Sequence, residues 1–414
     1  MNTSGLHEPI ASRLDEPIAT GLNEQELIDL TQHLVRMDSV AAPNRPHEIR
    51  VAQYLAQYLE QAGFEIKLEE VAPQRLNLMA RFDTGKPGSL LILEGHTDVV
   101  TEGERSAWTR DPFSGDIEDG ILWGRGSADM KGGLAAAIVA AKTIKNLVLE
   151  RKLDLRGELR LLIPCDEEGM MSGIKQMIRH SWHKKNGVVA DGAIICEPEE
   201  LELCLFQRGG IRVAIRFIGK QAHGAMPYAG INPIPWLAKA VLGIGQLEAE
   251  LQARTPVHPL LGKPYITPTV LGAGSLPQLN VMPGEALLAL DIRTIPGVDH
   301  AEIHARLRQI LDSIADAQTQ YEIVDDRPWT ATDPEAKIVR VLEEASRTVL
   351  KREPRYGGVP GTTDGTFLHQ AGVPIVTIGP GDREIPHQAN EFIRIDQLVL
   401  SAKLYTEAIA LFLS

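Results

Sequence analysis

A histidine and an aspartate two residues apart, His96 and Asp98, follow an apolar run and could bind a metal ion. The run, residues 89–95, is typical of a buried strand in a parallel sheet. Because residues two apart on an extended backbone point to the same side, both project from the carboxyl end of that strand, where α/β proteins place their sites. A carboxylate beside an imidazole fixes the tautomer of a metal-binding histidine. A purely structural hydrogen-bonded pair explains this one motif equally well.

A second acid, Asp129, lies in the glycine-rich loop 124–133, which leads into an alanine-rich helix at 134–145. Glycines there permit positive φ angles and a close approach of the backbone to a neighbour or ligand. The loop lacks both the Gly-Lys-Ser/Thr ending of a P-loop and the Gly-x-Gly-x-x-Gly turn. A phosphate cradle is therefore disfavoured.

Acidic and imidazole side chains follow three further apolar runs. Glu167 and Glu168 belong to Cys-Asp-Glu-Glu-Gly, and three consecutive carboxylates buried together would take up protons unless a cation lay nearby. A solvated acidic turn is the alternative for that motif. Glu197 follows the run 193–196, and His387 lies in the loop 379–391 after a strand-like segment.

These side chains share one predicted location, the carboxyl ends of strands in a single sheet. Imidazoles with hard carboxylate oxygens suit Zn²⁺, Mn²⁺ or Co²⁺ in a hydrolytic site. Two metal ions that share one bridging carboxylate need two histidines, two terminal acids and the bridge. That count is met by His96, Asp129, Glu168, Glu197 and His387. Glu167 is left over and could act as a general base.

The elements that must hold these residues alternate between strands and helices, which predicts an α/β domain with a mostly parallel sheet. From residue 210 the pattern changes, because 211–218 alternates apolar and polar residues as half-exposed antiparallel strands do. The order that follows is β-α-β-β-α-β, the ferredoxin-like arrangement. We therefore expect a poorly ordered leader at 1–24, a catalytic domain at 25–209 and 326–414, and an inserted α+β domain at 210–325.

The overall composition argues against some kinds of binding partner and indicates a cellular location. The chain has 414 residues and a formal net charge of −13, which argues against nucleic acid or an anionic membrane as a partner. Its three cysteines form no disulfide framework, and we see neither a signal peptide nor a membrane-spanning stretch. A cytoplasmic protein is expected.

His300 and His304 are four residues apart on a predicted helix and could together bind a metal ion. Without a carboxylate to join them, an exposed helix face is the simpler interpretation.

Five ordered motifs resemble those of the di-zinc amidohydrolases and metallopeptidases of the acetylornithine deacetylase, succinyl-diaminopimelate desuccinylase and glutamate carboxypeptidase type. They are Leu-Glu-Gly-His-Thr-Asp, Trp-Gly-Arg-Gly-Ser-Ala-Asp-Met-Lys-Gly-Gly, Cys-Asp-Glu-Glu-Gly, Cys-Glu-Pro and Ile-Pro-His-Gln-Ala-Asn-Glu. The resemblance implies two divalent ions per chain, zinc or alternatively cobalt or manganese. It implies His96, Asp129 and Glu197 on one ion, with His387, Asp129 and Glu168 on the other.

The same resemblance implies that Glu167 is the general base and that Asp98 is the partner of His96. It implies that the inserted domain is a lid through which two subunits form a homodimer, and that His223 in Ala-His-Gly-Ala-Met-Pro donates to the oxyanion. The candidate contacts to a substrate carboxylate are Arg208, Asn280, Arg293, Gly361 and Thr362. Arg208 could equally be a surface charge.

We therefore expect a hydrolase that cleaves the amide bond of a small, carboxylate-bearing N-acyl amino acid. A dipeptidase or carboxypeptidase would use the same machinery, as would a hydrolase that releases ammonia. A catalytically inactive binding protein is the alternative of another class. The metal motifs do not distinguish the acyl group or the amine.

Overall fold

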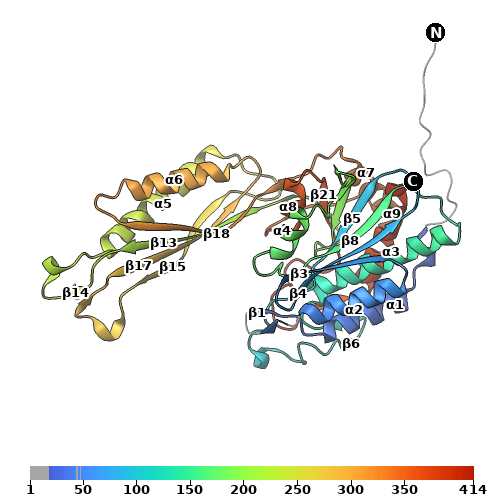
Figure 1. Cartoon of the computed structure of the whole chain (residues 1–414), viewed down its shortest axis with the longest axis horizontal. Helices are drawn as coiled ribbons and strands as arrows, with labels where there is room; N and C mark the ends of the chain where they lie inside the picture. The colour runs from blue at the N-terminus through green and yellow to red at the C-terminus, as the bar shows by residue number, and fades with distance from the viewer. Residues whose placement is uncertain (1–17, 43–44, 47) are drawn as a thin grey trace, which may run out of the picture. The chain divides into compact units, whose positions relative to one another are not determined.

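The computed structural model describes residues 18–414 except 43, 44 and 47, and the chain divides into two compact units (Figure 1). Unit 1 takes in the chain to Leu205, Thr332–Gly357 and Ala371–Ser414; unit 2 comprises Phe206–Ala331 and Gly358–Gln370. The segment 358–370, which we expected within the catalytic domain, thus groups with unit 2. Hydrogen bonds explain this, because Val359 accepts from the Arg208 amide and Thr363 donates to Gln207.

The described chain begins within the segment 1–24, which we expected to be a poorly ordered leader. Residues 1–17 of that leader lie outside the described residues. Ile18–Gly21 forms a short 3-10 helix, η2, in which Ile18 and Ala19 are buried. The Ile18 amide donates to Glu407 at 3.3 Å, so this segment is fixed against the C-terminal helix.

A mixed sheet has the strand order β19-β12-β21-β11-β5-β8-β4-β3, and β20 pairs with β12. The strands from β21 to β3 lie in unit 1, whereas β19 falls within unit 2. The four middle strands, β21, β11, β5 and β8, are parallel, while the flanking pairings are antiparallel. The α/β class is confirmed, and the sheet is parallel only at its centre. Strands β3 and β4 are antiparallel neighbours because a tight turn joins them, which parallel strands do not allow.

The strands of the central sheet are β3 (Glu65–Ala72), β4 (Arg75–Asp83), β5 (Leu90–Glu94), β8 (Glu158–Ile163), β11 (Gly192–Ile195), β12 (Leu203–Gln207), β19 (Thr330–Ala331), β20 (Tyr356–Val359) and β21 (Ile375–Thr377). The short strands of unit 1 are β1 (Ala41–Ala42), β2 (Arg45–Pro46), β6 (Ile117–Glu118), β7 (Ile121–Trp123), β9 (Lys184–Lys185), β10 (Val188–Val189) and β22 (Phe392–Arg394). Its helices are α1 (Glu24–Arg36), α2 (Glu48–Gln61), η3 (Arg105–Ala107), η4 (Ser127–Lys131), α3 (Gly132–Leu149), α4 (Ser172–Arg179), α7 (Lys337–Leu350) and α9 (Ile395–Leu413).

Helix α3 is the core helix of unit 1. Almost all of its residues through Ile144 are buried, and it packs against α9 and α1. Its alanine and glycine content explains this, because small side chains let a helix lie close to its neighbours. The segment Ser127–Leu149 is long and apolar enough to cross a membrane by length and composition, but 72% of its apolar window is buried inside the protein. Burial of this kind is typical of a core helix.

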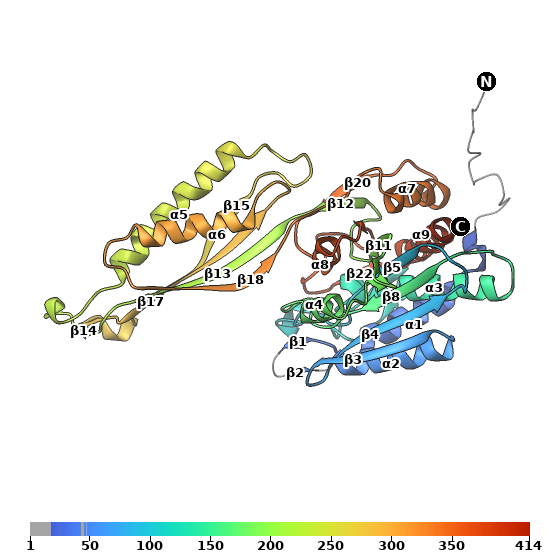
Figure 2. The same cartoon turned by 45° about the horizontal axis from the view of Figure 1, so that its top comes forward.

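Unit 2 is an antiparallel four-stranded sheet, ordered β15-β17-β13-β18, with two helices on one face (Figure 2). Alternate residues of β17 are buried, and they form one core with the apolar residues of both helices. The chain order β13-α5-β15-β17-α6-β18 is the ferredoxin-like order that the sequence predicts. The elements are β13 (Gly209–Ile218), β14 (Ala222–His223), η5 (Pro227–Ala229), α5 (Ile234–Arg254), β15 (Tyr265–Ala273), η6 (Leu276–Gln278), β16 (Val281–Met282), β17 (Glu285–Thr294), α6 (His300–Asp312), β18 (Thr319–Arg327) and α8 (Gly365–Gln370).

Candidate metal centre

The predicted metal ligands meet at the carboxyl ends of the parallel strands of unit 1. His96 follows β5, Glu168 follows β8, Glu197 follows β11 and His387 lies in the loop after β21. Because these four strands are parallel neighbours, their carboxyl ends lie at one edge of the sheet. Asp129 joins them from η4, the turn that precedes α3.

Glycines allow Asp129 to reach this edge. Gly126 adopts a φ of 82°, a conformation that residues with a Cβ rarely adopt. A Cβ on Gly133 would lie 1.9 Å from the carbonyl oxygen of Cys196. The start of α3 can therefore lie directly against the end of β11, next to Glu197, only with glycine at this position.

The Asp129 carboxylate lies between the two histidines. Its Oδ1 is 3.3 Å from His96 Nε2, and its Oδ2 is 3.3 Å from His387 Nε2. Glu197 Oε1 lies 3.6 Å from His96 Nε2, and Glu168 Oε2 lies 3.2 Å from His387 Nε2. Each imidazole thus has one terminal glutamate and one oxygen of the shared aspartate, which is the arrangement a pair of bridged metal ions requires.

Asp98 supports the site through the backbone. His96 Nδ1 lies 2.9 Å from the backbone carbonyl of Asp98 and 3.6 Å from its carboxylate, so the hydrogen bond that orients the ring goes to the carbonyl. The carboxylate instead accepts from the backbone amides of Glu167 at 3.1 Å and Glu168 at 3.0 Å. Asp98 therefore orients His96 and also holds the turn that carries both glutamates.

The electrostatics of the cluster show an excess of negative charge. Burial raises the pKa of Glu197 well above its usual value, and the nearby Asp129 carboxylate raises it further. The pKa of Glu168 is raised by the same two causes. Hydrogen bonds to Asp129 and Glu168 raise the pKa of His387 to about 10. Without a metal ion, these side chains retain protons because the cluster carries excess negative charge. Divalent cations would neutralise the same charge.

The surroundings of His96 Nε2 show that these side chains suit a metal ion. His96 is 1% exposed, and its Nε2 has no hydrogen-bond partner among the described residues, although three carboxylates lie within 4.0 Å. A buried polar atom without a partner is costly unless it binds something. Ligand atoms of His96, Asp129 and Glu168 also lie within 4.8 Å of one another. A metal ion on Nε2 would satisfy this nitrogen.

Glu167 is placed beside the ligands. It is 7% exposed, and its Oε2 lies 4.0 Å from His96 Nε2, farther than the Asp129 and Glu197 oxygens. The position agrees with a group that faces the metal site without completing either set of ligands. Cys165 and Cys196 are buried free thiols, and we assign neither a role in the chemistry.

The predicted residues of the inserted domain form two groups within unit 2. His223 and Asn280 are neighbours, because β14 pairs with β16 and the Asn280 carbonyl accepts from Gly224. His223 Nδ1 accepts from the Ala225 amide at 3.0 Å, which leaves the proton of the neutral ring on the exposed Nε2. That nitrogen is free to donate to a ligand oxygen.

The second group surrounds Gly210. A Cβ on this glycine would lie 3.8 Å from Arg293 Nη1 and 3.7 Å from Thr362 Oγ1, and Gly361 adjoins Thr362. Arg293 binds Asp291 through Nε at 2.6 Å and Nη2 at 3.1 Å. Arg208 donates to the backbone carbonyls of Leu261 and Lys263. The structure thus gives Arg208 a role in holding the loop before β15, in addition to any contact with substrate.

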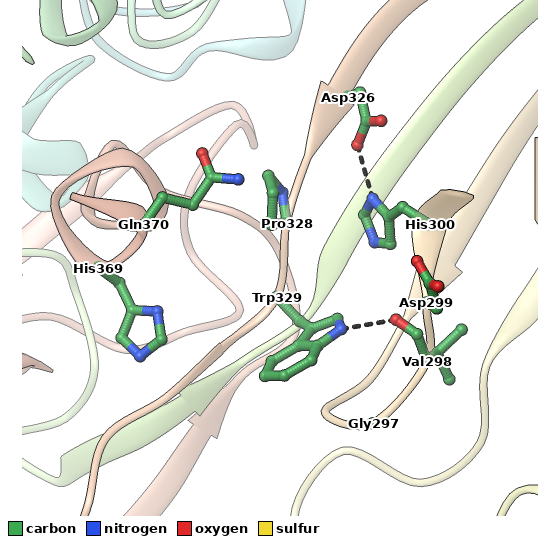
Figure 3. A pocket seen from close by; sticks show the side chains of 9 residues that line it. All are labelled: Gly297, Val298, Asp299, His300, Asp326, Pro328, Trp329, His369 and Gln370. Carbon is green, nitrogen blue, oxygen red and sulfur yellow. Dashed lines mark hydrogen bonds and ion pairs between the residues drawn. The ribbon is translucent and has the colours of Figure 1, made fainter. Parts of the chain in front are cut away.

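The prediction that His300 and His304 lie on an exposed face of α6 is wrong. His300 Nδ1 and His304 Nε2 bind the two oxygens of Asp326, at 2.6 and 3.2 Å, and His300 Nε2 lies 2.7 Å from the Thr294 hydroxyl. The missing carboxylate comes from β18, beside a pocket of about 670 Å³ (Figure 3). Thr294 is fully buried, so this Thr-His-Asp arrangement cannot present a nucleophile to a substrate. It braces α6 against β17 and β18.

Two further residues at the metal site were not singled out from the sequence. Glu391 is fully buried and accepts hydrogen bonds from the amides of Ala128 and Asp129, and Arg125 pairs with it. The only local signal was an acid four residues after His387 and an arginine between the glycines of the loop. Neither pattern indicates a contact across more than 260 residues of chain.

A cluster of imidazoles and carboxylates sharing one aspartate, on the edge of an α/β sheet, defines a metal-dependent hydrolase. Residues 92–411 match the model of peptidase family M20/M25/M40. The chain belongs to this family, and it is a metal-dependent amidohydrolase acting on C–N bonds. Among its relatives, the protein named succinyl-diaminopimelate desuccinylase from Stenotrophomonas maltophilia is 32% identical over 397 residues, covering 92% of this chain and 97% of that protein.

Solved structures share the fold. An M20 family metallo-carboxypeptidase from Sulfolobus solfataricus has a TM-score of 0.77 at 21% identity, covering 94% of this chain and 99% of that one. A dinuclear metal binding peptidase of the M20 family from Bacillus subtilis has a TM-score of 0.68 at 17% identity, covering 94% and 98%. At these identities the likeness establishes the fold alone.

Proposed function

We propose that this chain uses two divalent metal ions to hydrolyse the amide bond of a small N-acyl amino acid that carries a free carboxylate. The observation that carries the proposal is the position of Asp129, whose two oxygens each face one histidine at 3.3 Å. His96 and Glu197 would complete one site, and His387 and Glu168 the other. Zinc suits these ligands, as do cobalt and manganese.

When bound, the metal ions supply Lewis-acid chemistry, which polarises the scissile carbonyl and lowers the pKa of a water molecule. Glu167 would accept the proton of the attacking water and deliver it to the leaving amine. Its place beside His96, outside the closest ring of oxygens, supports this role. Asp98 would keep Glu167 in place through the backbone amide that its carboxylate accepts.

Residues of unit 2 would bind the rest of the substrate. His223 would donate Nε2–H to the oxyanion that develops on the carbonyl oxygen, a contribution of about 3 kcal/mol per donor. Arg293, with Asn280, Gly361 and Thr362, would hold the substrate carboxylate, because a guanidinium binds a carboxylate through two parallel hydrogen bonds. Arg208 would contribute through its position beside Arg293.

We further propose that unit 2 acts as a lid and pairs two chains in a homodimer. Strand β15 is an edge of its sheet, and Val270 and Leu271 are exposed on it. Leu276 and Leu279, in the turn that follows, are each 85% exposed. An edge strand that carries exposed apolar side chains suits pairing with a second chain. In such a dimer His223 would act on the partner subunit's substrate.

The substrate class rests on the relatives. The Stenotrophomonas protein is named a desuccinylase, and we propose an N-acyl substrate of the acetyl or succinyl type. Three buried free cysteines support a reducing, cytoplasmic location.

The direct test is hydrolysis of a panel of N-acetyl, N-succinyl and N-formyl amino acids and dipeptides, with zinc, cobalt or manganese added to metal-free protein. We expect metal-dependent release of the free amino acid from an N-acyl compound. Preferential cleavage of dipeptides would instead identify a dipeptidase or carboxypeptidase, and release of ammonia a deaminase. Two bound metals without turnover of any amide would identify a binding protein.

A further inference from the structure

One buried carboxylate joins the loop of His387 to the loop of Asp129. Glu391 follows His387 by four residues and has no exposed surface. Its Oε1 accepts from the backbone amides of Ala128 at 3.0 Å and Asp129 at 3.1 Å, and its backbone carbonyl accepts from Gly124 at 2.8 Å. The backbone of the bridging residue is therefore tied directly to the loop that carries a terminal ligand.

The other oxygen of Glu391 binds an arginine that is itself fixed. Oε2 accepts from Arg125 Nη1 at 2.5 Å, and Arg125 is 1% exposed. Its guanidinium lies over the ring of Trp108, 5.2 Å from the centroid, and its backbone amide donates to Pro112. Apolar side chains of similar size usually stabilise a fold as well as a buried ion pair does. The stability of the fold therefore does not by itself explain why a charged pair lies at this position.

The geometry explains what the pair can do. The two oxygens of Asp129 must each point to a different histidine, which requires a defined backbone position as well as a side-chain rotamer. Glu391 holds that backbone through the amide of Asp129 itself, and the same loop sets the position of His387 Nε2, 3.3 Å from Asp129 Oδ2. A shift of the Asp129 loop would therefore change both distances of the bridge, and a shift of the His387 loop would change the distance to His387.

We propose that Glu391 and Arg125 are positioning residues that set the place of Asp129 between the two metal sites. The inference rests on the proposed metal-dependent function and deepens it. Neither residue belongs to the proposed set of metal ligands. Both act through Asp129, as hydrogen-bonding partners of metal ligands do elsewhere, where their loss typically costs about 10–100-fold in metal affinity or activity.

The test compares Glu391→Ala, Glu391→Gln and Arg125→Lys with the wild-type protein. The alanine variant removes both acceptors, whereas glutamine keeps one carbonyl oxygen for the two amides and loses the charge that Arg125 needs. Glu158→Gln is the matched control, because Glu158 is a fully buried carboxylate paired with Arg160 at the opposite end of strand β8. It should lower the stability of the fold without altering the metal site.

The readouts are zinc affinity, by competition with a chromogenic chelator, and the melting temperature of the metal-free protein. We expect two zinc ions in the wild type, about 10–100-fold weaker zinc binding in Glu391→Ala, a smaller loss in Glu391→Gln and Arg125→Lys, and unchanged affinity in Glu158→Gln. Wild-type zinc affinity in a folded Glu391→Ala protein would overturn the inference and leave the proposed function standing. Equal losses in Glu158→Gln would also overturn it. A wild-type chain that binds fewer than two metals would overturn the proposed function as well.

Discussion

Replacing Asp129 by alanine tests the bridge most directly, because one side chain is asked to serve two sites. In the proposed arrangement each metal ion has three protein ligands, and one oxygen of Asp129 faces each histidine at 3.3 Å. Zinc binding in four-ligand structural sites is worth about 10–16 kcal/mol, or about 3 kcal/mol per ligand, and a loss of that size weakens binding about 100-fold. Asp129→Ala should therefore weaken both sites by about 100-fold.

The comparison with Glu197→Ala makes the result specific. Glu197 Oε1 lies 3.6 Å from His96 Nε2, and we propose it for that site alone. Its removal should therefore weaken one site by about 100-fold and leave the other close to the wild type. The assay is elemental analysis after equilibration in zinc buffers of fixed free concentration. At a concentration where the wild type holds two zinc ions, Glu197→Ala should hold one and Asp129→Ala almost none. An Asp129→Ala protein that keeps one tightly bound zinc would refute the bridging geometry.

The remaining predictions concern single residues. Glu167→Gln should lower kcat by about 10²–10⁴-fold, as expected for a lost general base, and keep two metals in elemental analysis; loss of metal would make Glu167 a ligand. Arg293→Lys should raise KM for substrates with a free carboxylate far more than for their esters, because lysine lacks the bidentate fork; equal effects would indicate a structural arginine. Glu167→Ala and His223→Ala dimers should each be inactive. When the two variants are mixed and exchange subunits, roughly a quarter of wild-type activity should return, because half of the dimers are hybrids and each hybrid has one intact site. If exchange is confirmed and no activity returns, His223 does not act in the partner's site. Burial raises the pKa of Glu158, but Arg81, Arg160 and Lys185 lower it to about 2. A folded-state pKa below the ordinary value stabilises the fold above about pH 4.5, and this stabilisation is lost as the pH falls through 2. Glu158→Gln should thus cost about 3 kcal/mol at pH 7 and far less at pH 2 in urea unfolding; a pH-independent difference would contradict the ion pairs.

The sequence predicts the strands that end at the metal centre, because apolar runs followed by His, Asp or Glu are local signals. His96, Glu168, Glu197 and His387 follow those runs, and the structure brings them together at one sheet edge. The βαββαβ order of unit 2 is predicted for the same reason, since alternation and helical periodicity are properties of short segments.

Contacts between distant segments could not be predicted in this way. Asp326 joins His300 and His304 because β18 lies beside α6, and no spacing within the helix indicates this. The Asp98 carboxylate binds backbone amides 69 and 70 residues away, although its neighbour His96 suggests a local pair. The antiparallel flanks of the central sheet likewise depend on which strands pair.

The two histidines of the metal centre differ sharply in their access to solvent. The His96 side chain is 1% exposed, whereas that of His387 is 55% exposed. An ion held by the exposed His387 would exchange more readily with the surrounding solution than an ion held by the buried His96, which would need a local opening. The two proposed positions should therefore hold their ions for different times, and we expect a chelator to remove metal in two kinetic phases. A chain reloaded after the fast phase with a second element would carry two different metals, one retained from its original loading and one taken from its present medium.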